Sequence, residues 1–193
     1  MRRKSRAPVS APTHKRAHHS GPLGSADVTV GVVAKRSNAV PSVASVQGTV
    51  GSRTATSLNV SMVKVYAMSV ITDCRGSLSF GELNQPIPFE AKRYFVVYDV
   101  KDGFERGRHA HRKCHQFVVC VAGSVLVTVD DGKSSDSIAL GNPSVGIHVP
   151  PLVWTTLSKF SENATVLVLA SEIFRESDYI RSYDLFLREV AGK

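Results

Sequence analysis

The pattern of apolar and polar positions changes near residue 62. From there on, short runs of β-branched and aromatic residues alternate with turn sequences, at the spacing that is typical of an all-β sandwich or barrel. The runs are VKVYAMSVI, RYFVVYDV, QFVVCVAGSVLVTVDD, SIAL, GIHVPP and TVLVLAS, and the turn sequences include DCRGS, NQPIPFE, VKDGFERG, AGS, DDGKSS and GNPSVG. Glycine, proline, asparagine and aspartate in these turns favour tight reversals of the chain. The pattern therefore predicts an all-β jelly roll that resembles a barrel.

The period of the apolar residues changes again at the C-terminal end. In ESDYIRSYDLFLREV they recur at the spacing of one helix face. These residues are Ile180, Tyr183, Phe186, Leu187 and Val190. We therefore expect one C-terminal helix that closes the barrel, with Asp178 and Arg181 in structural roles where the helix docks.

Composition separates the beginning of the chain from the rest. Residues 1–57 are rich in Ser, Ala, Pro, Gly and Val, and no aromatic residue occurs before Tyr66. This segment has nine basic residues and one acidic residue, a net charge of +8, whereas the remainder has fifteen of each and is neutral. A segment with nothing to anchor a core is expected to be disordered. We expect a disordered basic extension at residues 1–61 and one folded domain at residues 62–193.

The extension also limits the classes of partner. Its charges are scattered and no aromatic side chain is available to stack on bases, so we expect no nucleic-acid partner. Its Arg- and Ser-rich composition leaves two alternatives open, an organelle transit peptide and a mis-assigned start codon. No apolar run is long enough to span a membrane or to act as a secretory signal, so we expect a cytoplasmic protein without membrane association. Three cysteines without CxxC spacing, Cys74, Cys114 and Cys120, are expected to be reduced structural thiols.

The stretch RGRHAHRKCHQFVVCVAG contains the strongest chemical signal. His109 and His111 are one residue apart, so in a strand they point to the same face while Ala110 points to the other. Such a pair can chelate a metal with further ligands, act as acid and base, or form the solvated end of an ordinary strand. The spacing alone leaves these three alternatives open.

The neighbours of the pair resemble the first signature of the cupin superfamily. His109, His111, Gln116 and Gly123 form the arrangement HxHx4Qx6G. The resemblance implies a double-stranded β-helix, the RmlC-like jelly roll. Metal-binding cupins have Glu at the position of Gln116, and their second signature ends in a histidine where PPLVWT has Thr155. An amide and a hydroxyl are poor substitutes for these ligands, so we expect no metal and no other cofactor, and the histidines remain for acid–base chemistry.

A closer resemblance is carried by six motifs that occur in order from about Met62 to Phe186. They are DCRGSLSFGE, IPFEAKRYFVVYDV, RGRHAHRKCHQFVVCVAGSVLVTVDDG, PSVGIHVPPLVW, VLVLASEIF and SDYIRSYDLF. Together they resemble the cupin-fold sugar-nucleotide 3,4-ketoisomerases. The resemblance implies a metal-independent homodimer that converts dTDP-4-keto-6-deoxyglucose to the 3-keto isomer through an enediol, in deoxyamino-sugar biosynthesis. A related cupin epimerase and a non-catalytic protein that binds sugar nucleotides remain the alternatives.

The same resemblance implies residue roles. His109 is the expected base at C3, and His111 is expected to hold the enediolate oxygen or relay its proton, because imidazole can accept and donate protons near neutral pH. The residues expected to contact or position the substrate are Arg75, Arg93, Arg106, Gln116, Trp154 and Thr155. For the two arginines expected to clamp the diphosphate, Arg75 and Arg93, the alternative is a surface ion pair. For Trp154 the alternative is a core position.

Two positions depart from the family pattern. Many members have a tyrosine at the position of Phe95, so here the proton relay requires water, Tyr98 or His111. Thr155 stands where a histidine or arginine is common. We expect Thr155 to face the barrel interior and to influence which face of C4 is protonated, so the stereochemistry of the product is open.

Overall fold

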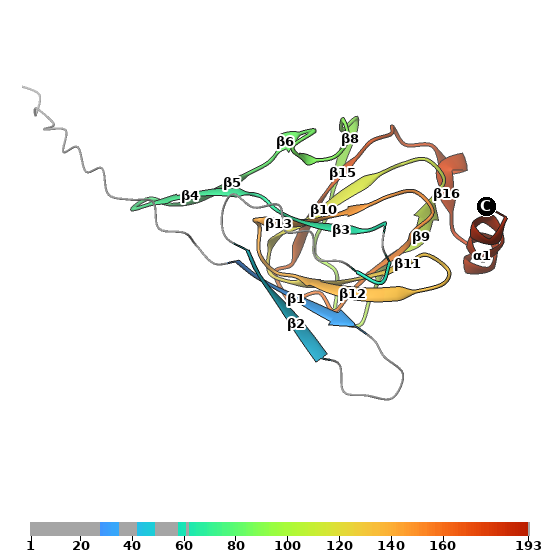
Figure 1. The fold of residues 1–193 in the computed structure, drawn as a ribbon, viewed down its shortest axis with the longest axis horizontal. Coiled ribbons are helices and arrows are strands. Elements are labelled where there is room, and N and C mark those ends of the chain that lie inside the picture. Colours follow the sequence, from blue (N-terminus) through green and yellow to red (C-terminus); the bar gives the residue numbers. More distant parts are fainter. Residues whose placement is uncertain (1–27, 35–41, 49–57, 61, 193) are drawn as a thin grey trace, which may run out of the picture.

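The computed structural model describes residues 28–34, 42–48, 58–60 and 62–192, and for 28–34 and 42–48 only the backbone. Its main body consists of two antiparallel β-sheets that face each other (Figure 1). The described α-helix α1 (Tyr183–Ala191) has nine residues and lies at one end of this body. Within the described ranges, no helix is long and apolar enough to cross a membrane.

One sheet has seven strands in the order β16-β9-β14-β11-β12-β1-β2. Their bounds are β1 Val28–Ala34, β2 Ser42–Gly48, β9 Arg106–His111, β11 Val125–Asp130, β12 Ser135–Leu140, β14 Trp154–Ser158 and β16 Tyr179–Ile180. The other sheet has five strands in the order β3-β13-β10-β15-β8. Their bounds are β3 Lys64–Ala67, β8 Arg93–Val97, β10 Gln116–Ala122, β13 Val145–Val149 and β15 Thr165–Ala170.

The core lies between the two sheets and is built by alternation along the strands. In β11, Val125, Val127 and Val129 are buried while the residues between them are partly exposed, as expected when one face of a strand packs inward. Val166 and Val168 of β15 join the same cluster from the opposite sheet. The all-β jelly roll expected from the apolar runs is therefore confirmed.

The core begins before the boundary that we expected at residue 62. Leu58 and Val60 are buried in the main cluster. The backbone N–H of Val60 and the side-chain amide of Asn59 donate to the buried carboxylate of Asp136, at 3.2 and 3.0 Å. This burial could not be predicted from the sequence, because a single valine and a single leucine among polar residues do not form a strand pattern. Residues 58–60 therefore belong to the folded body.

Two strands also fall inside the segment 1–61 that we expected to be disordered. β1 pairs with β2 along its length and with β12 at Val32↔Ile138 and Val33↔Ser137. The other residues of that segment, apart from 58–60, lie outside the described ranges, so disorder there stays a prediction.

The C-terminal helix is confirmed, but it begins later than the apolar spacing indicated. Residues Glu176–Asp178 form a 3₁₀ turn, η1, and Ile180 lies in the short strand β16, which pairs with β9. Ser182 caps the helix by accepting a hydrogen bond from the N–H of Leu185. Ile180 is buried against Phe186 from its place in β16. A buried Ile180 also fits the apolar spacing of a helix, which is why the helix was expected to begin earlier.

The expected run VKVYAMSVI is divided between two strands, and further strands lie where we expected turns or a motif alone. β4 (Ser69–Asp73) and β5 (Gly76–Phe80) form a hairpin around the DCRG turn, and β6 (Glu82–Leu83) and β7 (Pro86–Ile87) follow it. Figure 1 shows the hairpin extending from the body on the side opposite to β9, β16 and α1. β14 was not among the predicted strands, because its sequence WTTLS lacks a β-branched apolar run.

Candidate active site

His109 and His111 lie side by side on one face of β9. Their ring centroids are 5.0 Å apart and their planes are nearly perpendicular, at 83°. Ala110, between them, is fully buried on the other face with Phe186 of α1. The histidines therefore share the face opposite to Ala110, as the HxH spacing predicted, and this face is turned away from the helix.

The backbone before the pair is shaped by a glycine. Gly107 has φ +82°, and a Cβ there would lie 2.6 Å from the carbonyl oxygen of Thr155 on β14. Only glycine fits this close approach. The carbonyl of Gly107 accepts a hydrogen bond from Nδ1 of His109 at 3.0 Å. That bond leaves Nε2 of His109 as the unprotonated nitrogen of the neutral ring.

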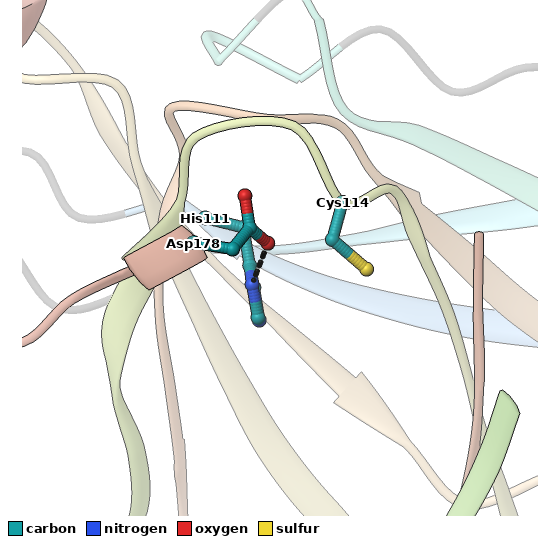
Figure 2. A group of neighbouring side chains, drawn as sticks. All are labelled: His111, Cys114 and Asp178. Carbon is teal, nitrogen blue, oxygen red and sulfur yellow. Dashed lines mark hydrogen bonds and ion pairs between the residues drawn. The ribbon is translucent and has the colours of Figure 1, made fainter. Parts of the chain in front are cut away.

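His111 is held on both sides. Its Nδ1–H donates to Oδ2 of Asp178 at 2.8 Å (Figure 2), and its Nε2 accepts from the side-chain amide of Gln116 at 3.1 Å. Asp178 is itself anchored, because its Oδ1 accepts from the backbone N–H of Lys113 at 2.8 Å. The ring of His111 therefore has a fixed orientation.

Burial sets the protonation of both histidines. It lowers the pKa of His111 to about 4, and the hydrogen bond to Asp178 only partly opposes this effect. Burial also lowers the pKa of His109, although the hydrogen bond to Gly107 acts in the opposite direction. For Asp178, burial raises the pKa, but the hydrogen bonds from His111 and Lys113 outweigh it, so its pKa is lowered. At neutral pH the site thus contains two neutral imidazoles and one carboxylate.

An aromatic and a guanidinium group complete the face. The ring of Tyr179 lies 4.9 Å from His109 and 4.3 Å from His111, measured between centroids. Arg93 of β8 donates from Nη2 to the hydroxyl of Tyr179 at 3.4 Å and stacks over Phe95 at 5.5 Å. Since β8 belongs to the opposite sheet, the histidines face the space between the two sheets.

Two buried polar atoms at this face have no hydrogen-bond partner among the described residues. They are Nε of Arg93 and Oγ1 of Thr155. Thr155 is only 5% exposed and lies directly opposite His109 in the β14–β9 ladder. Buried polar groups are nearly always paired in proteins, so these two atoms indicate a polar ligand between the sheets.

The structure brings five of the expected site residues together at the histidine face. His109, His111, Gln116 and Thr155, the four positions of the cupin signatures, converge there, and Arg93 joins them from β8. The first four are the positions at which metal-binding cupins hold their ion. The amide of Gln116 and the hydroxyl of Thr155 do not suit that role.

Arg75 lies elsewhere in the chain. It is at the tip of the β4–β5 hairpin, pairs with Asp73, and its side chain is 86% exposed. Figure 1 places that hairpin far from β9. Within one chain, Arg75 therefore forms a surface ion pair, which was the alternative to clamping the diphosphate of the substrate.

The contacts of Arg106 and Trp154 in the described residues are with other parts of the fold. Arg106 is exposed at the start of β9, opposite Leu157. Trp154 packs against Tyr183 and Phe186 of the helix, at 5.2 and 5.7 Å between ring centroids. Trp154 therefore packs against the helix, which was the alternative to contact with the substrate.

Asp178 and Tyr179 are functional residues that the sequence reasoning missed. We expected Asp178 to dock the helix, but it binds His111, and Tyr179 contacts both imidazoles. Arg181 lies over the Tyr179 ring at 4.5 Å and pairs with Glu176 at 2.8 Å. Apolar periodicity has no signal for such contacts, because it depends only on which residues are buried.

The two-sheet barrel and the convergence of the signature positions define the class, which is the cupin fold of the RmlC type. The solved rmlC epimerase of Mycobacterium tuberculosis has this fold, with a TM-score of 0.59 over 65% of this chain and 71% of that one. At 20% identity this likeness concerns the fold alone. The expected RmlC-like fold is confirmed.

Within this class the sequence comparison shows the family. The family model described as "FdtA: WxcM-like, C-terminal" matches residues 61–191, and the chain belongs to this family. The TDP-4-oxo-6-deoxy-alpha-D-glucose-3,4-oxoisomerase of Aneurinibacillus thermoaerophilus is 44% identical over 128 residues, which are 66% of this chain and 92% of that protein.

Solved structures agree with this assignment. The sugar 3,4-ketoisomerase QdtA of Thermoanaerobacterium thermosaccharolyticum, in complex with TDP, is 38% identical with a TM-score of 0.66, over 67% of this chain and 95% of that one. A 3,4-ketoisomerase of Helicobacter canadensis is 40% identical with a TM-score of 0.65, over 67% and 97%. The resemblance that we inferred from the six motifs is confirmed.

Proposed function

We propose that this protein is a sugar-nucleotide 3,4-ketoisomerase that converts a dTDP-4-keto-6-deoxyhexose to its 3-keto isomer without a metal ion. The observation that carries the proposal is the arrangement of His109 and His111, two neutral imidazoles in contact on one face with their tautomers set by neighbouring acceptors. Membership of a family whose relatives are 3,4-ketoisomerases supports the same reaction.

The reaction needs a base for the proton on C3 and a route for a proton to C4. Nε2 of His109 has its lone pair free because Nδ1 donates to Gly107, so it can remove the C3 proton. The electron pair of the broken C–H bond forms the C3–C4 double bond, and the C4 carbonyl becomes an enediolate oxygen. A proton added at C4, with loss of the proton from the C3 hydroxyl, completes the 3-keto product.

His111 suits the second role. It lies 5.0 Å from His109, and Asp178 holds its Nδ1–H, so it can support the enediolate or relay its proton. Of the three relay groups considered in the absence of a hydroxyl at Phe95, Tyr98 is 62% exposed, whereas His111 contacts His109. Water remains compatible with the geometry. We therefore assign the relay to His111, directly or through water.

Substrate contacts follow from the unpaired polar atoms. Arg93 has donors free for a phosphate or a sugar oxygen, and Oγ1 of Thr155 is available beside His109 to a hydroxyl or carbonyl of the sugar ring. The position of Thr155 suits an influence on which face of C4 is protonated. Binding of TDP by the QdtA ketoisomerase supports a TDP-linked substrate.

We also infer a homodimer in the cytoplasm. The β4–β5 hairpin exposes Ile71, Leu78 and Phe80, at 51%, 59% and 42%, as expected of strands that a second chain covers. In such a dimer Arg75 at its tip would act on the partner rather than on its own site. The three cysteines are free thiols, which fits a reducing compartment.

Proton NMR of the purified protein with dTDP-4-keto-6-deoxyglucose tests the proposed reaction. We expect loss of the C3 proton signal in deuterated buffer and growth of a 3-keto product. Exchange at C5 instead would indicate the epimerase alternative. Binding without any exchange would indicate the non-catalytic alternative, and either result would refute the proposal.

A further inference from the structure

Three potential metal ligands lie together at the histidine face, and the proposed reaction uses two of them, the histidine and the carboxylate. His111 ends β9, Cys114 is in the loop between β9 and β10, and Asp178 ends η1 (Figure 2). One ligand atom from each, a ring nitrogen, Sγ and a carboxylate oxygen, lies within 4.8 Å of the other two. We propose that His111, Cys114 and Asp178 form an inhibitory site for a thiophilic divalent cation such as Zn²⁺.

The geometry is close to that of a zinc site. With Zn–N and Zn–O bonds of about 2.0–2.1 Å and Zn–S of about 2.3 Å, tetrahedral ligand atoms are roughly 3.3–3.6 Å apart. Nδ1 of His111 and Oδ2 of Asp178 are already 2.8 Å apart. Sγ of Cys114 needs to move by on the order of 1 Å. It can do so because Cys114 lies outside the strands and its Sγ only donates to the carbonyl of His115, at 3.3 Å.

The chemistry of the three donors selects the ion. A thiolate, an imidazole and a carboxylate favour Zn²⁺ and Co²⁺ over Mg²⁺ and Ca²⁺, which prefer oxygen ligands alone. Thiolate and carboxylate together carry two negative charges, so a divalent cation neutralises a site in which His111 and Cys114 are 5% and 1% exposed. This set is distinct from the cupin signature positions, since it uses the nitrogen of His111 that faces Asp178 rather than the one that faces Gln116.

Binding would stop the proton transfer, an inference that rests on the proposed function. The cation takes the lone pair of Nδ1 of His111, so the single ring proton moves to Nε2, and the cation replaces the thiol proton of Cys114, so one proton is released. Neither nitrogen of His111 can then accept another proton. The metal-free protein is the active form, and the cation is an inhibitor.

Cobalt absorption tests the site without reference to activity. Titration of the metal-free, full-length protein with Co²⁺ should give the thiolate-to-cobalt charge-transfer band in the near ultraviolet, and Zn²⁺ should abolish it. Histidines elsewhere, such as His14, His18 and His19, can bind cobalt but cannot produce this band. The band should be absent in Cys114→Ser and in Cys114→Ala, and present in the control Cys74→Ser, which removes the exposed thiol.

Inhibition by Zn²⁺ is the second measurement. Zn²⁺ should inhibit the isomerase reversibly, with recovery on chelation, and Cys114→Ser should raise the inhibitory concentration by about tenfold to a hundredfold or more while basal activity is kept. Absence of the band in the unaltered protein, its persistence in Cys114→Ser, or equal inhibition of Cys114→Ser would overturn the proposal. A protein that gives the band but does not isomerise the keto sugar would refute the proposed function and leave the cation site standing.

Discussion

The two histidines of β9 differ in what holds them, and this difference explains how two identical side chains can have two roles. His109 donates to a neutral carbonyl, that of Gly107, whereas His111 donates to the carboxylate of Asp178. A carboxylate stabilises the protonated ring far more than a carbonyl does. Burial nevertheless keeps the pKa of His111 at about 4, so His111 is neutral at rest and the carboxylate supports a proton on it only while the proton is relayed. His109 is the base with the free nitrogen.

Replacement of Asp178 tests this division of roles. In Asp178→Asn the charge that supports a protonated His111 is lost, while the amide can still accept the hydrogen bond. We expect kcat to fall by at least roughly tenfold, towards the order of 10⁴ seen when the orienting carboxylate of a Ser-His-Asp site is removed, with little change in TDP affinity. Steady-state kinetics and TDP titration measure both. Glu176→Gln, on the exposed rim, is the matched control and should retain kcat.

A second histidine pair, on the outside of the five-stranded sheet, should control acid stability. Nδ1 of His115 and Nε2 of His148 are 2.9 Å apart in nearly parallel rings, next to Phe89. Burial lowers the pKa of His148 from 6.5 to about 4, helped by the charges of His115 and Lys64. The unfolded chain thus binds more protons between these pH values.

It follows that His148 contributes stability that is complete above about pH 6.5 and is lost as pH falls towards 4. His148→Gln keeps a hydrogen-bonding side chain without a titrating group. We expect its free energy of unfolding in urea to fall less steeply than that of the unaltered protein over this range. Parallel curves for the two proteins would show that His148 does not cause the acid sensitivity.

Residue chemistry could be predicted from the sequence only in part. The HxH spacing placed His109 and His111 on one face, because strand geometry follows directly from sequence spacing. The resemblance to the cupin signatures, not geometry, placed Gln116 and Thr155 beside them. Asp178 and Tyr179 come from a segment 67 residues after His111. Contacts at such separations depend on how strands pair, which no local pattern specifies.

At the scale of elements, the strands with β-branched runs were predictable and the mixed strands were not. β10, β11 and β15 have such runs, and burial on one or both faces maintains them. β14 has mostly polar residues and β16 has only two residues, so neither has a run that predicts a strand, and both pair with β9. Both flank the histidines, so the elements hardest to predict are those that build the site.

The segment before β3 gives a prediction at this scale. A chain that begins at Met62 lacks the buried Leu58 and Val60 and leaves the buried carboxylate of Asp136 without two of its donors. Each buried apolar side chain contributes about 1.5–3 kcal/mol. We expect this chain to melt well below one that begins at residue 56.

Thermal unfolding of three chains separates the contributions. The chain that starts at residue 56 serves as the control for the loss of Leu58 and Val60, and the full-length chain reports on β1, which pairs with β12. Equal melting temperatures for the chains from 56 and 62 would contradict the importance of residues 58–60.

At the scale of the whole molecule, the hairpin β4–β5 is the feature that one chain leaves uncovered. Ile71 and Leu78 face solvent, and Arg75 stands at the tip. We expect light scattering at micromolar concentration to give the mass of a dimer, and Leu78→Asp to shift the protein towards monomer. Thr72→Asp, at a polar position of the same hairpin, is the control. A monomer mass for the unaltered protein would contradict the dimer.

The most direct test of the account is exchange of the C3 proton by His109→Asn. Asparagine preserves some hydrogen bonding but cannot cycle a proton near neutral pH, so TDP should still bind while kcat falls by about a hundredfold to ten-thousandfold. His115→Asn, on the outer pair, is the control and should exchange normally. In deuterated water with dTDP-4-keto-6-deoxyglucose, we predict that His109→Asn leaves the C3 proton in place on the timescale at which the unaltered protein removes it. Exchange at a near-normal rate would contradict the account and make His111 the first alternative for the base.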